Sequence, residues 1–392
     1  MSAQIREAPQ GHATRDAKRP VAVLSITDGL YAIRDRLLAS PDFQRFAGSF
    51  PLTRRIANKQ ALALFDLCAG FVYSQILAAC VELKLFRRLQ GEPKSLEQLA
   101  REVNLPAERL ARLLDGAVSL RLLSRRSRNR YGLGMLGAAL VNDSGIDAMI
   151  QHHAMLYRDL ADPVALLRDR DGRSELASFW GYAGSNDSAM LGDDAVAAYS
   201  DLMARSQSFI ARDVLDAYRF DRHSCLMDVG GGEGAFVAAA AAKYPKLNFK
   251  LFDLPAVADR AQRRMAATGL GGRVSVHGGS FRDGPLPRGA DLISLVRVLH
   301  DHDDPVAAQL LRAVYAALPA GGQLLIAEPM AGVPGADHVG RAYFGFYLMA
   351  MGSGRARTAQ EICKLLAGAG FKPPRILRTR QPMLVGALVA SK

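Results

Sequence analysis

The spacing of hydrophobic positions changes near residue 224. Beyond that point, short apolar runs such as CLMDV, FKLFD and ADLISLV alternate with longer segments whose apolar residues recur at helical spacing. Apolar runs separated by helices predict strands buried on both faces, and hence a mainly parallel sheet covered by helices on both sides. Seven strands fit into this part of the chain, so the pattern predicts an α/β domain over residues 221–392.

Upstream of the sheet the pattern is helical. Residues 59–145 predict three helices, the second starting with the capping-box pair Ser95 and Gln98, and then two short strands around the basic turn in LLSRRSRNRYGLG. Three helices followed by a β-hairpin predict a winged-helix domain. Residues 146–220 predict a helical connector rich in Tyr, Met and His, and residues 1–58 predict a basic arm with one helix, TDGLYAIRDRLLAS.

Length, charge and cysteine content narrow the class of protein. A chain of 392 residues with 49% hydrophobic and 22% charged residues predicts two or three domains with sizeable cores. A net charge of +12 favours an acidic partner such as nucleic acid, an anionic membrane surface or an anionic cofactor. The four cysteines lie far apart without a C-x-x-C motif, which is typical of reduced cytoplasmic thiols.

Neither the N-terminus nor the longest apolar stretch predicts membrane insertion. The first twenty residues lack the apolar core of a signal peptide, and the stretch Ala61–Phe86 is interrupted by polar and charged residues. We therefore expect a cytoplasmic protein that makes at most a peripheral contact with a membrane.

The stretch LMDVGGGEGAF joins the first predicted strand of the sheet to its helix. Its alternating glycines, Gly230, Gly232 and Gly234, allow the positive φ angles of a tight turn and let a ligand approach the backbone. Asp228 precedes the loop inside the strand, and Asp253 ends the next strand in FDLP. A carboxylate at that position accepts hydrogen bonds from ribose hydroxyls, although it could instead cap the following helix. The loop predicts a nucleotide-like ligand.

Five motifs in order reveal a family resemblance. DVGGGEG, FDLP, GGSF, VLHDHDD and ALPAGGQLLIAEPM resemble those of the S-adenosylmethionine-dependent O-methyltransferases of the hydroxyindole and plant caffeate type, and residues 81–134 resemble their winged-helix dimerisation domain. The resemblance implies a Rossmann-like, seven-stranded class I methyltransferase core, S-adenosylmethionine as methyl donor, no metal, and a homodimer formed through the N-terminal domain.

The same resemblance implies the catalytic residues. In the family, the histidine of the HD motif is the general base that takes the proton of the acceptor hydroxyl, and it matches His300. A carboxylate at the end of the next strand orients that histidine, which here implies Glu328. Asp301, the second residue of the motif, completes the catalytic set.

The chain departs from the family at several cofactor positions. Val296 stands where a cofactor-binding lysine is expected, and Ser280 where an aspartate is expected. His302 replaces the aromatic residue after HD, and Ala356 replaces a second acid before an Arg-Thr pair. The implied cofactor-binding residues are Asp228, Gly230, Gly232, Asp253, Leu254, Ser280, Phe281 and Arg297.

A closer resemblance concerns the acceptor. HHAMLYRDLADPVALLRD, YSDLMARSQ and AYFGFYLMAMGSGRART resemble segments of the demethylspheroidene (hydroxyneurosporene) O-methyltransferases of purple photosynthetic bacteria. That resemblance implies methylation of the tertiary C-1 hydroxyl of an acyclic carotenoid. A polyene needs a long apolar slot with few polar groups. The residues expected to line it are His153, Tyr157, Met203, Phe346 and Met349, with Trp180, Tyr182, Gln207, Phe344, Tyr347 and Met351 as further candidates.

The histidine-aspartate stretch VLHDHDD allows two other interpretations. His300 and His302, with Asp301, Asp303 and Asp304, are residue types that bind metals. The two histidines would, however, point to opposite sides of a continuing strand. Asp303 and Asp304 precede the helical segment PVAAQLLRAVYAAL, where acids cap a helix N-terminus and complement its dipole.

Two alternatives differ in function class. The wing sequence RRSRNR and the positive charge are typical of a winged-helix DNA-binding regulator, although the complete set of cofactor motifs argues against a nucleic-acid partner. The fold also allows an O-methyltransferase whose acceptor is a phenol, polyketide or indole. A basic arm could rest on anionic lipid or simply form a solvated face.

Overall fold

The computed structural model describes residues 26–141, 144–168, 174–179, 207 and 210–392. The chain forms two compact units that divide between Gln75 and Ile76. Residues 58 and 59, between which a domain boundary was expected, both lie in one helix, α3 (Pro51–Glu82). Trp180, Tyr182 and Met203, which were candidates for the acceptor pocket, lie outside the described residues.

The N-terminal arm is more helical than its sequence predicts. Besides the expected helix α1 (Ile26–Ala39), it contains α2 (Pro41–Ser49) and the first turns of α3. The side chain of Ser40 caps α2 by accepting a hydrogen bond from the backbone N–H of Phe43. Large apolar side chains are exposed along all three helices, for example Ile26 at 86%.

Helix α3 has the length and apolar composition of a membrane-crossing helix. It is 32 residues long, and only 11% of its most apolar window is buried inside the chain. The polar residues that interrupt its sequence leave its mean hydropathy high enough for a membrane-crossing helix. Its apolar side chains are therefore available to surroundings outside this chain.

The winged-helix prediction is confirmed by the elements that follow. The predicted long helix ends at Glu82, and Lys84 takes a left-handed conformation before α4 (Leu85–Arg88). Helices α5 (Leu96–Val103) and α6 (Ala107–Ser119) follow, and α5 starts with the predicted capping box. Strands β1 (Leu123–Arg126) and β2 (Arg130–Leu133) form the antiparallel hairpin, and α7 (Met135–Leu140) comes next.

The described part of the connector is helical, as predicted. It contains α8 (Ser144–Asp159), α9 (Pro163–Arg168) and α10 (Glu175–Phe179). Leu156 of α8 and Leu176 of α10 share a buried cluster with Leu348, which belongs to the C-terminal domain. The connector helices therefore pack against that domain.

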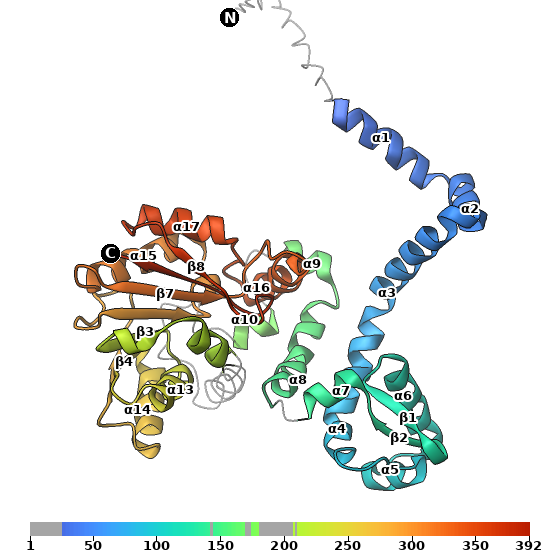
Figure 1. Cartoon of the computed structure of the whole chain (residues 1–392), viewed down its shortest axis with the longest axis horizontal. Coiled ribbons are helices and arrows are strands. Elements are labelled where there is room, and N and C mark those ends of the chain that lie inside the picture. Colours follow the sequence, from blue (N-terminus) through green and yellow to red (C-terminus); the bar gives the residue numbers. More distant parts are fainter. Residues whose placement is uncertain (1–25, 142–143, 169–173, 180–206, 208–209) are drawn as a thin grey trace, which may run out of the picture. The chain divides into compact units, whose positions relative to one another are not determined.

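The predicted seven-stranded sheet is confirmed, and Figure 1 shows its strands with helices on both faces. Its strand order is β5-β4-β3-β6-β7-β9-β8, and the first five strands in this order are parallel while β9 runs antiparallel to its two neighbours. The strands are β3 (Cys225–Val229), β4 (Asn248–Asp253), β5 (Val274–Gly278), β6 (Leu292–Val296), β7 (Gln323–Glu328), β8 (Arg375–Leu377) and β9 (Gly386–Ser391).

Alternate residues of each central strand enter different cores. Leu226 of β3 packs in one buried cluster with residues of α13 (Ala235–Lys243) and α14 (Pro255–Ala267). The next residue, Met227, packs in the other cluster with α15 (Asp304–Ala317) and α17 (Ala359–Gly368). This two-sided burial holds the parallel strands in register, so that their carboxyl ends meet at one edge.

Three short helical segments complete the region beyond that edge. A 3-10 turn, Leu299–Asp301, begins three residues after the end of β6. A π-helix, Val339–Phe344, continues without interruption into α16 (Gly345–Met351). Because π-helical turns are rare and are found frequently at functional sites, this segment is a candidate part of the site.

Candidate active site

The glycine loop after β3 has the predicted backbone conformation. Gly230, Gly232 and Gly234 have φ angles of 69°, 56° and 82°. A Cβ atom on Gly230 would lie 2.7 Å from the side chain of Val298, whereas a Cβ on Gly232 would meet open space. Gly230 thus lets the loop pack against the segment before His300, and Gly232 leaves room for a ligand.

The carboxylate of Asp253 joins the end of β4 to this loop. It accepts hydrogen bonds from the backbone N–H of Gly232 and of Leu254, both at 2.7 Å. Burial raises the pKa of Asp253 to about 6, against the opposing effect of these two N–H groups. The structure therefore brings Asp253, Leu254 and Gly232 together at the edge where a nucleotide ligand was predicted.

Asp228 lies beneath the loop. Its side chain accepts a hydrogen bond of 2.6 Å from the hydroxyl of Ser294 on β6, and its second oxygen lies 2.9 Å from where a Cβ on Gly231 would be. Asp228 is 2% exposed, and burial raises its pKa to about 7. This geometry supports the loop from below, and a direct contact of Asp228 with a ligand stays a prediction.

His300 lies between two carboxylates. Its Nδ1 forms a very short hydrogen bond with one oxygen of Glu328, and its Nε2 lies 3.1 Å from Asp301 Oδ1. The other oxygen of Glu328 accepts the backbone N–H groups of Val298 and Leu299 at 3.0 and 2.7 Å. Glu328, buried at 2% exposure, therefore fixes both the imidazole and the backbone that carries it.

The two carboxylates change the proton affinity of this histidine. Burial alone would lower the pKa of His300, but the charges of Asp301 and Glu328 outweigh it and raise the pKa above its ordinary value. Burial in turn raises the pKa of Asp301 to about 6, against the opposing charge of His300. The site is therefore built to receive and hold one proton on the imidazole.

The remaining predicted cofactor residues lie around the next loop. Phe281 packs edge-on against His302 with ring centroids 5.4 Å apart, and Ser280 Oγ accepts the N–H of Arg282 at 3.1 Å. Burial, reinforced by the charge of Arg282, lowers the pKa of His302 to about 4, so His302 acts as a neutral ring. Phe281 also packs against the core below it, so its ring serves the fold as well.

Arg297 has an unusual backbone conformation. Its φ angle is 57°, a left-handed value that costs a non-glycine residue about 1–3 kcal/mol and is concentrated at functional sites. The pKa values of His300, Asp301 and Tyr343 are all raised, by the two carboxylates for His300 and by burial for the other two, and the charge of Arg297 opposes the rise in each. Arg297 therefore lies near the catalytic candidates, as expected.

The acceptor candidates form an aromatic cluster that reaches His300. His153 Nε2 is hydrogen-bonded to Tyr343 Oη at 2.7 Å, and His152 Nε2 to Tyr347 Oη at 2.9 Å. The ring of Phe344 lies edge-on to His300, with centroids 6.2 Å apart.

Other acceptor candidates have different surroundings. Tyr157 and Met349 are half-buried, whereas Phe346 is 38% exposed. Tyr343 was missed in the sequence. It lies four residues before Tyr347, and the two tyrosines bind the adjacent His153 and His152.

Asp303 and Asp304 lie at the start of their helix, as predicted, but their side chains have other partners. Helix α15 does begin at Asp304, with Asp303 at its N-cap position, but the Asp303 side chain makes no cap hydrogen bond. It accepts the backbone N–H of Gly354 at 3.0 Å instead, and Asp304 pairs with Arg355 and Arg357. Both acids therefore bind residues 354–357, a contact between distant segments that the sequence spacing does not predict.

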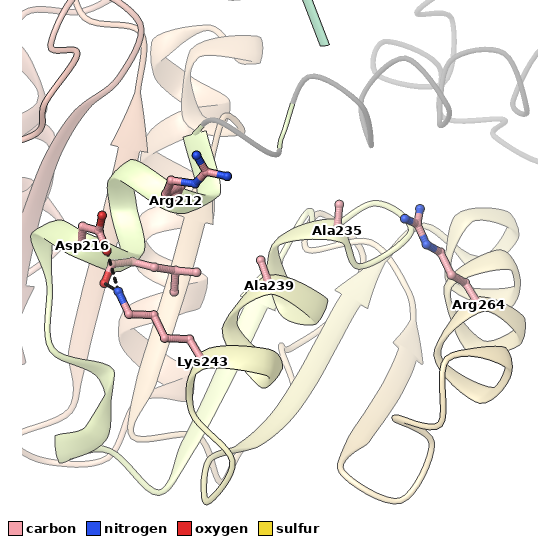
Figure 2. Close-up of a pocket in the computed structure, with 7 residues that line it drawn as sticks. Arg212, Asp216, Ala235, Ala239, Lys243 and Arg264 are labelled. Carbon is pink, nitrogen blue, oxygen red and sulfur yellow. Dashed lines mark hydrogen bonds and ion pairs between the residues drawn. The ribbon is translucent and has the colours of Figure 1, made fainter. Parts of the chain in front are cut away.

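A separate hollow lies on the outer side of α13 (Figure 2). It has a volume of about 400 Å³ and is lined by Arg212, Leu215, Asp216, Ala235, Ala239, Lys243 and Arg264. None of the predicted site residues lines it. Within the described ranges, no group of three or more His, Cys, Asp or Glu side chains could hold a metal ion.

Comparison with known proteins identifies the family. The O-methyltransferase domain matches residues 157–372, and the O-methyltransferase dimerisation domain matches residues 65–143. The chain belongs to the O-methyltransferase family. The winged-helix region therefore matches a dimerisation domain of methyltransferases. The basic wing of this region had suggested a DNA-binding regulator as an alternative.

Two relatives of this O-methyltransferase are similar over most of its length. The demethylspheroidene O-methyltransferase of Cereibacter sphaeroides is 44% identical over 362 residues, which cover 92% of this chain and 95% of that protein. The demethylspheroidene O-methyltransferase of Rhodobacter capsulatus is 42% identical over 359 residues, covering 91% and 88%. The resemblance recognised in the sequence is confirmed.

Solved structures confirm the class I methyltransferase fold. Human N-acetylserotonin methyltransferase in complex with SAM has a TM-score of 0.69 at 26% identity, covering 85% of this chain and 97% of that one. CalO1, a methyltransferase of calicheamicin biosynthesis in its SAH-bound form, has the same TM-score and identity and covers 85% and 98%.

The raised pKa of Asp228 implies that the free energy of unfolding depends on pH. A buried acid whose folded pKa is about 7 takes up a proton on folding, so its ionisation destabilises the fold as pH rises from about 4 to about 7. We expect the unfolding free energy of the wild type, relative to Asp228→Asn, to fall by about 4 kcal/mol across that window, because each pKa unit is worth about 1.4 kcal/mol.

Urea unfolding of both proteins from pH 4 to pH 8 measures this difference. Asparagine keeps an oxygen for the Ser294 hydroxyl, so the substitution removes the charge with little change of shape. A difference between the two proteins that stays constant with pH would show that Asp228 is ionised in the folded state throughout.

Proposed function

We propose that this chain transfers the methyl group of S-adenosylmethionine to the tertiary C-1 hydroxyl of an acyclic carotenoid of the demethylspheroidene or hydroxyneurosporene type. The products are a methyl ether and S-adenosylhomocysteine. The observation that carries the proposal is the placement of His300, held by Glu328 and Asp301, next to Val298, which contacts the glycine loop. The names of the two relatives supply the acceptor.

The glycine loop and its surroundings fit a nucleoside cofactor. The backbone is open at Gly232, and the carboxylate of Asp253 lies beside it, where it can exchange its backbone N–H partners for ribose hydroxyls. Phe281 and Ser280 are proposed to line the adenine side, with Leu254 and Arg297 as further contacts. S-adenosylmethionine supplies an electrophilic methyl group that needs no metal.

His300 is proposed to take the proton of the acceptor hydroxyl at Nε2. An ordinary histidine, with a pKa of about 6.5, is far too weak a base to ionise a tertiary alcohol before attack. The proton therefore moves as the methyl–oxygen bond forms, when the oxygen becomes strongly acidic. Glu328 and Asp301 stabilise the imidazolium that results, and the fixed ring holds the oxygen in line.

The aromatic cluster suits an apolar acceptor despite its two histidines. His152 and His153 each use Nε2 on a tyrosine hydroxyl, so the polar atoms of these pairs satisfy one another. Burial lowers the pKa of His152 to about 4 and lowers that of His153, so both are uncharged at neutral pH. What the cluster offers a ligand is mainly the surface of neutral rings, in contact with the base through Phe344.

Each domain of the chain is proposed to have its own role. Residues 59–145 would form the homodimer. Residues 146–220, through His153, Tyr157 and Met203, would line the acceptor pocket together with Phe346 and Met349. Residues 221–392 would bind S-adenosylmethionine. The arm, residues 1–58, is proposed to touch an anionic membrane in which the carotenoid is dissolved. Its exposed apolar side chains lie among exposed arginines and lysines, a composition that suits a lipid surface.

The base assignment predicts a characteristic pH dependence. Because the pKa of His300 is raised, kcat/KM should fall as pH drops through a midpoint above about 6.5, where the imidazole becomes protonated. Asp301→Asn removes one of the charges that raise this pKa, so the midpoint should move to lower pH while kcat decreases.

Rate profiles from pH 5 to pH 10 measure the midpoint. Asp283→Asn, which changes an exposed acid, serves as the matched control and should leave the midpoint unchanged. A midpoint that is the same in Asp301→Asn and in the control would contradict the proposed pairing of His300 with Asp301.

The acceptor is tested by methyl transfer from labelled S-adenosylmethionine to a detergent-dispersed 1-hydroxy carotenoid. We expect a labelled methoxy-carotenoid, no effect of EDTA, and a decrease of about 100-fold or more in kcat for His300→Ala, the range for loss of a general base. Phenolic and indole acceptors are run alongside. Label in those acceptors alone would keep the reaction class and refute the carotenoid, and loss of activity with EDTA would refute metal-free catalysis.

The membrane contact predicts binding to vesicles that contain anionic lipid. The full chain should co-sediment with phosphatidylserine-containing vesicles at low salt, and reversing the charges of Arg36, Arg54 and Arg55, all exposed on the arm, should weaken binding by about fivefold per charge. The control reverses three exposed charges of the sheet domain, Lys246, Arg263 and Arg288. Equal loss in both triple variants, or no binding by the wild type, would show that the arm is a solvated or subunit-facing surface.

A further inference from the structure

We propose that the segment Ser353–Arg357 is the positioning element of the general base. It holds the turn that carries His300 by its backbone, while Glu328 holds the imidazole. The proposal rests on the base role of His300 given above and extends it to residues that touch no substrate.

The carbonyl groups of the turn show how it is held. A 3-10 turn of three residues supplies only two hydrogen bonds of its own here, at 3.2 and 3.4 Å. All four carbonyls from Leu299 to His302 instead accept hydrogen bonds from the Ser353–Arg357 segment. The donors are Arg357 Nη1 to Leu299 O at 2.9 Å, Arg355 N to His300 O at 2.9 Å, Ser353 Oγ to Asp301 O at 2.9 Å, and Arg357 Nη2 to His302 O at 2.7 Å.

Burying the charged side chain of Arg357 costs free energy, because the guanidinium loses its hydration. Its side chain is 2% exposed, and its only acidic partner in the described part of the chain is Asp304, at 2.7 Å. A buried cation is tolerated only when its donors are satisfied with good geometry. The planar guanidinium of Arg357 achieves this by bonding the carbonyls on both sides of His300 and Asp301, which fixes the spacing of the turn.

Gly354 lets the segment approach the turn closely. Its φ angle is 84°, and a Cβ atom there would overlap the carbonyl oxygen of His300 and lie 2.6 Å from the carbonyl carbon of Asp301. The neighbouring backbone N–H of Gly354 donates to Asp303 at 3.0 Å. A residue larger than glycine would therefore have to push the catalytic turn away.

The same stretch of chain also touches the imidazole itself. Phe344 packs edge-on to the His300 ring, and α16 connects Phe344 to Gly352, the residue that precedes the segment. The base is thus held at its carboxylate side by Glu328, at its backbone by the segment, and at its ring by Phe344. Because the bond from Nε2 to the acceptor must be set to within a fraction of an ångström, this threefold support bears directly on turnover.

The test compares Gly354→Ala with Gly269→Ala. Gly269 has a similar φ angle of 73°, but a Cβ atom there meets open space, so it controls for backbone strain alone. We expect kcat for Gly354→Ala to fall by about 100-fold, the effect of misplacing a reacting group by about 1 Å, while Gly269→Ala stays near the wild type. The affinity for S-adenosylhomocysteine should change far less than kcat.

A second variant guards against misfolding. Ser353→Ala removes one hydroxyl donor from the turn and should lower kcat by about tenfold without unfolding the chain, and Ser353→Thr, which keeps the hydroxyl, should restore it. NMR titration of the His300 ring, assigned with His300→Gln, provides a readout that needs no acceptor. Its midpoint should move to lower pH in Gly354→Ala, because the ring loosens from the carboxylates that raise its pKa.

The outcomes separate this proposal from the proposed function. A wild type that methylates no carotenoid refutes the acceptor, and the His300 midpoint then still tests the segment. The proposal is overturned if Gly354→Ala and Ser353→Ala match Gly269→Ala in both kcat and His300 midpoint, or if their loss of activity follows their loss of stability alone.

Discussion

The buried contact between Glu328 and His300 is the constraint on which the rest of the site depends. Two parallel strands, β6 and β7, end side by side, and this adjacency alone brings residue 328 to residue 300. Glu328 uses one oxygen for the imidazole and the other for the backbone N–H groups of Val298 and Leu299. A single carboxylate thus fixes the tautomer, the ring and the start of the turn.

The neighbouring features of the site follow from that contact. Because Glu328 occupies Nδ1, Nε2 is the nitrogen that can receive the proton of an acceptor hydroxyl. In this structure Nε2 lies 3.1 Å from Asp301 Oδ1, so the acceptor hydroxyl has to take the place of that carboxylate oxygen. Val298, whose backbone N–H donates to Glu328, also packs against Gly230. This contact connects the cofactor loop to the segment that carries the base. Cofactor loop and base are therefore parts of one packed unit, and a shift of the turn disturbs both.

Much of this arrangement could be predicted from the sequence, because it depends on local pattern. Apolar runs predicted the strands, and alternating glycines predicted the loop. The acid at the end of β4 was predicted to face a ligand at this edge, and the structure adds its contact with the N–H of Gly232. The resemblance to the family then placed His300 and Glu328, which the strand order confirms as neighbours.

The parts that could not be predicted depend on contacts between distant segments. Asp304 looked like a helix cap, but its partner Arg357 lies fifty-three residues away along the chain, and no local rule pairs them. Tyr343 became visible only when the π-helix placed it opposite His153. The start of α3 at Pro51 was missed because residues 51–60 are mostly polar, although they form one unbroken helix with the apolar residues that follow.

A structure of the complex with S-adenosylhomocysteine and a 1-hydroxy carotenoid tests the central claim most directly. The account predicts the acceptor oxygen within about 3 Å of His300 Nε2, the distance needed for proton transfer, with Glu328 still bonded to Nδ1. An acceptor oxygen bound to another group, with Nε2 still closed off by Asp301, would contradict the role of His300 as the base.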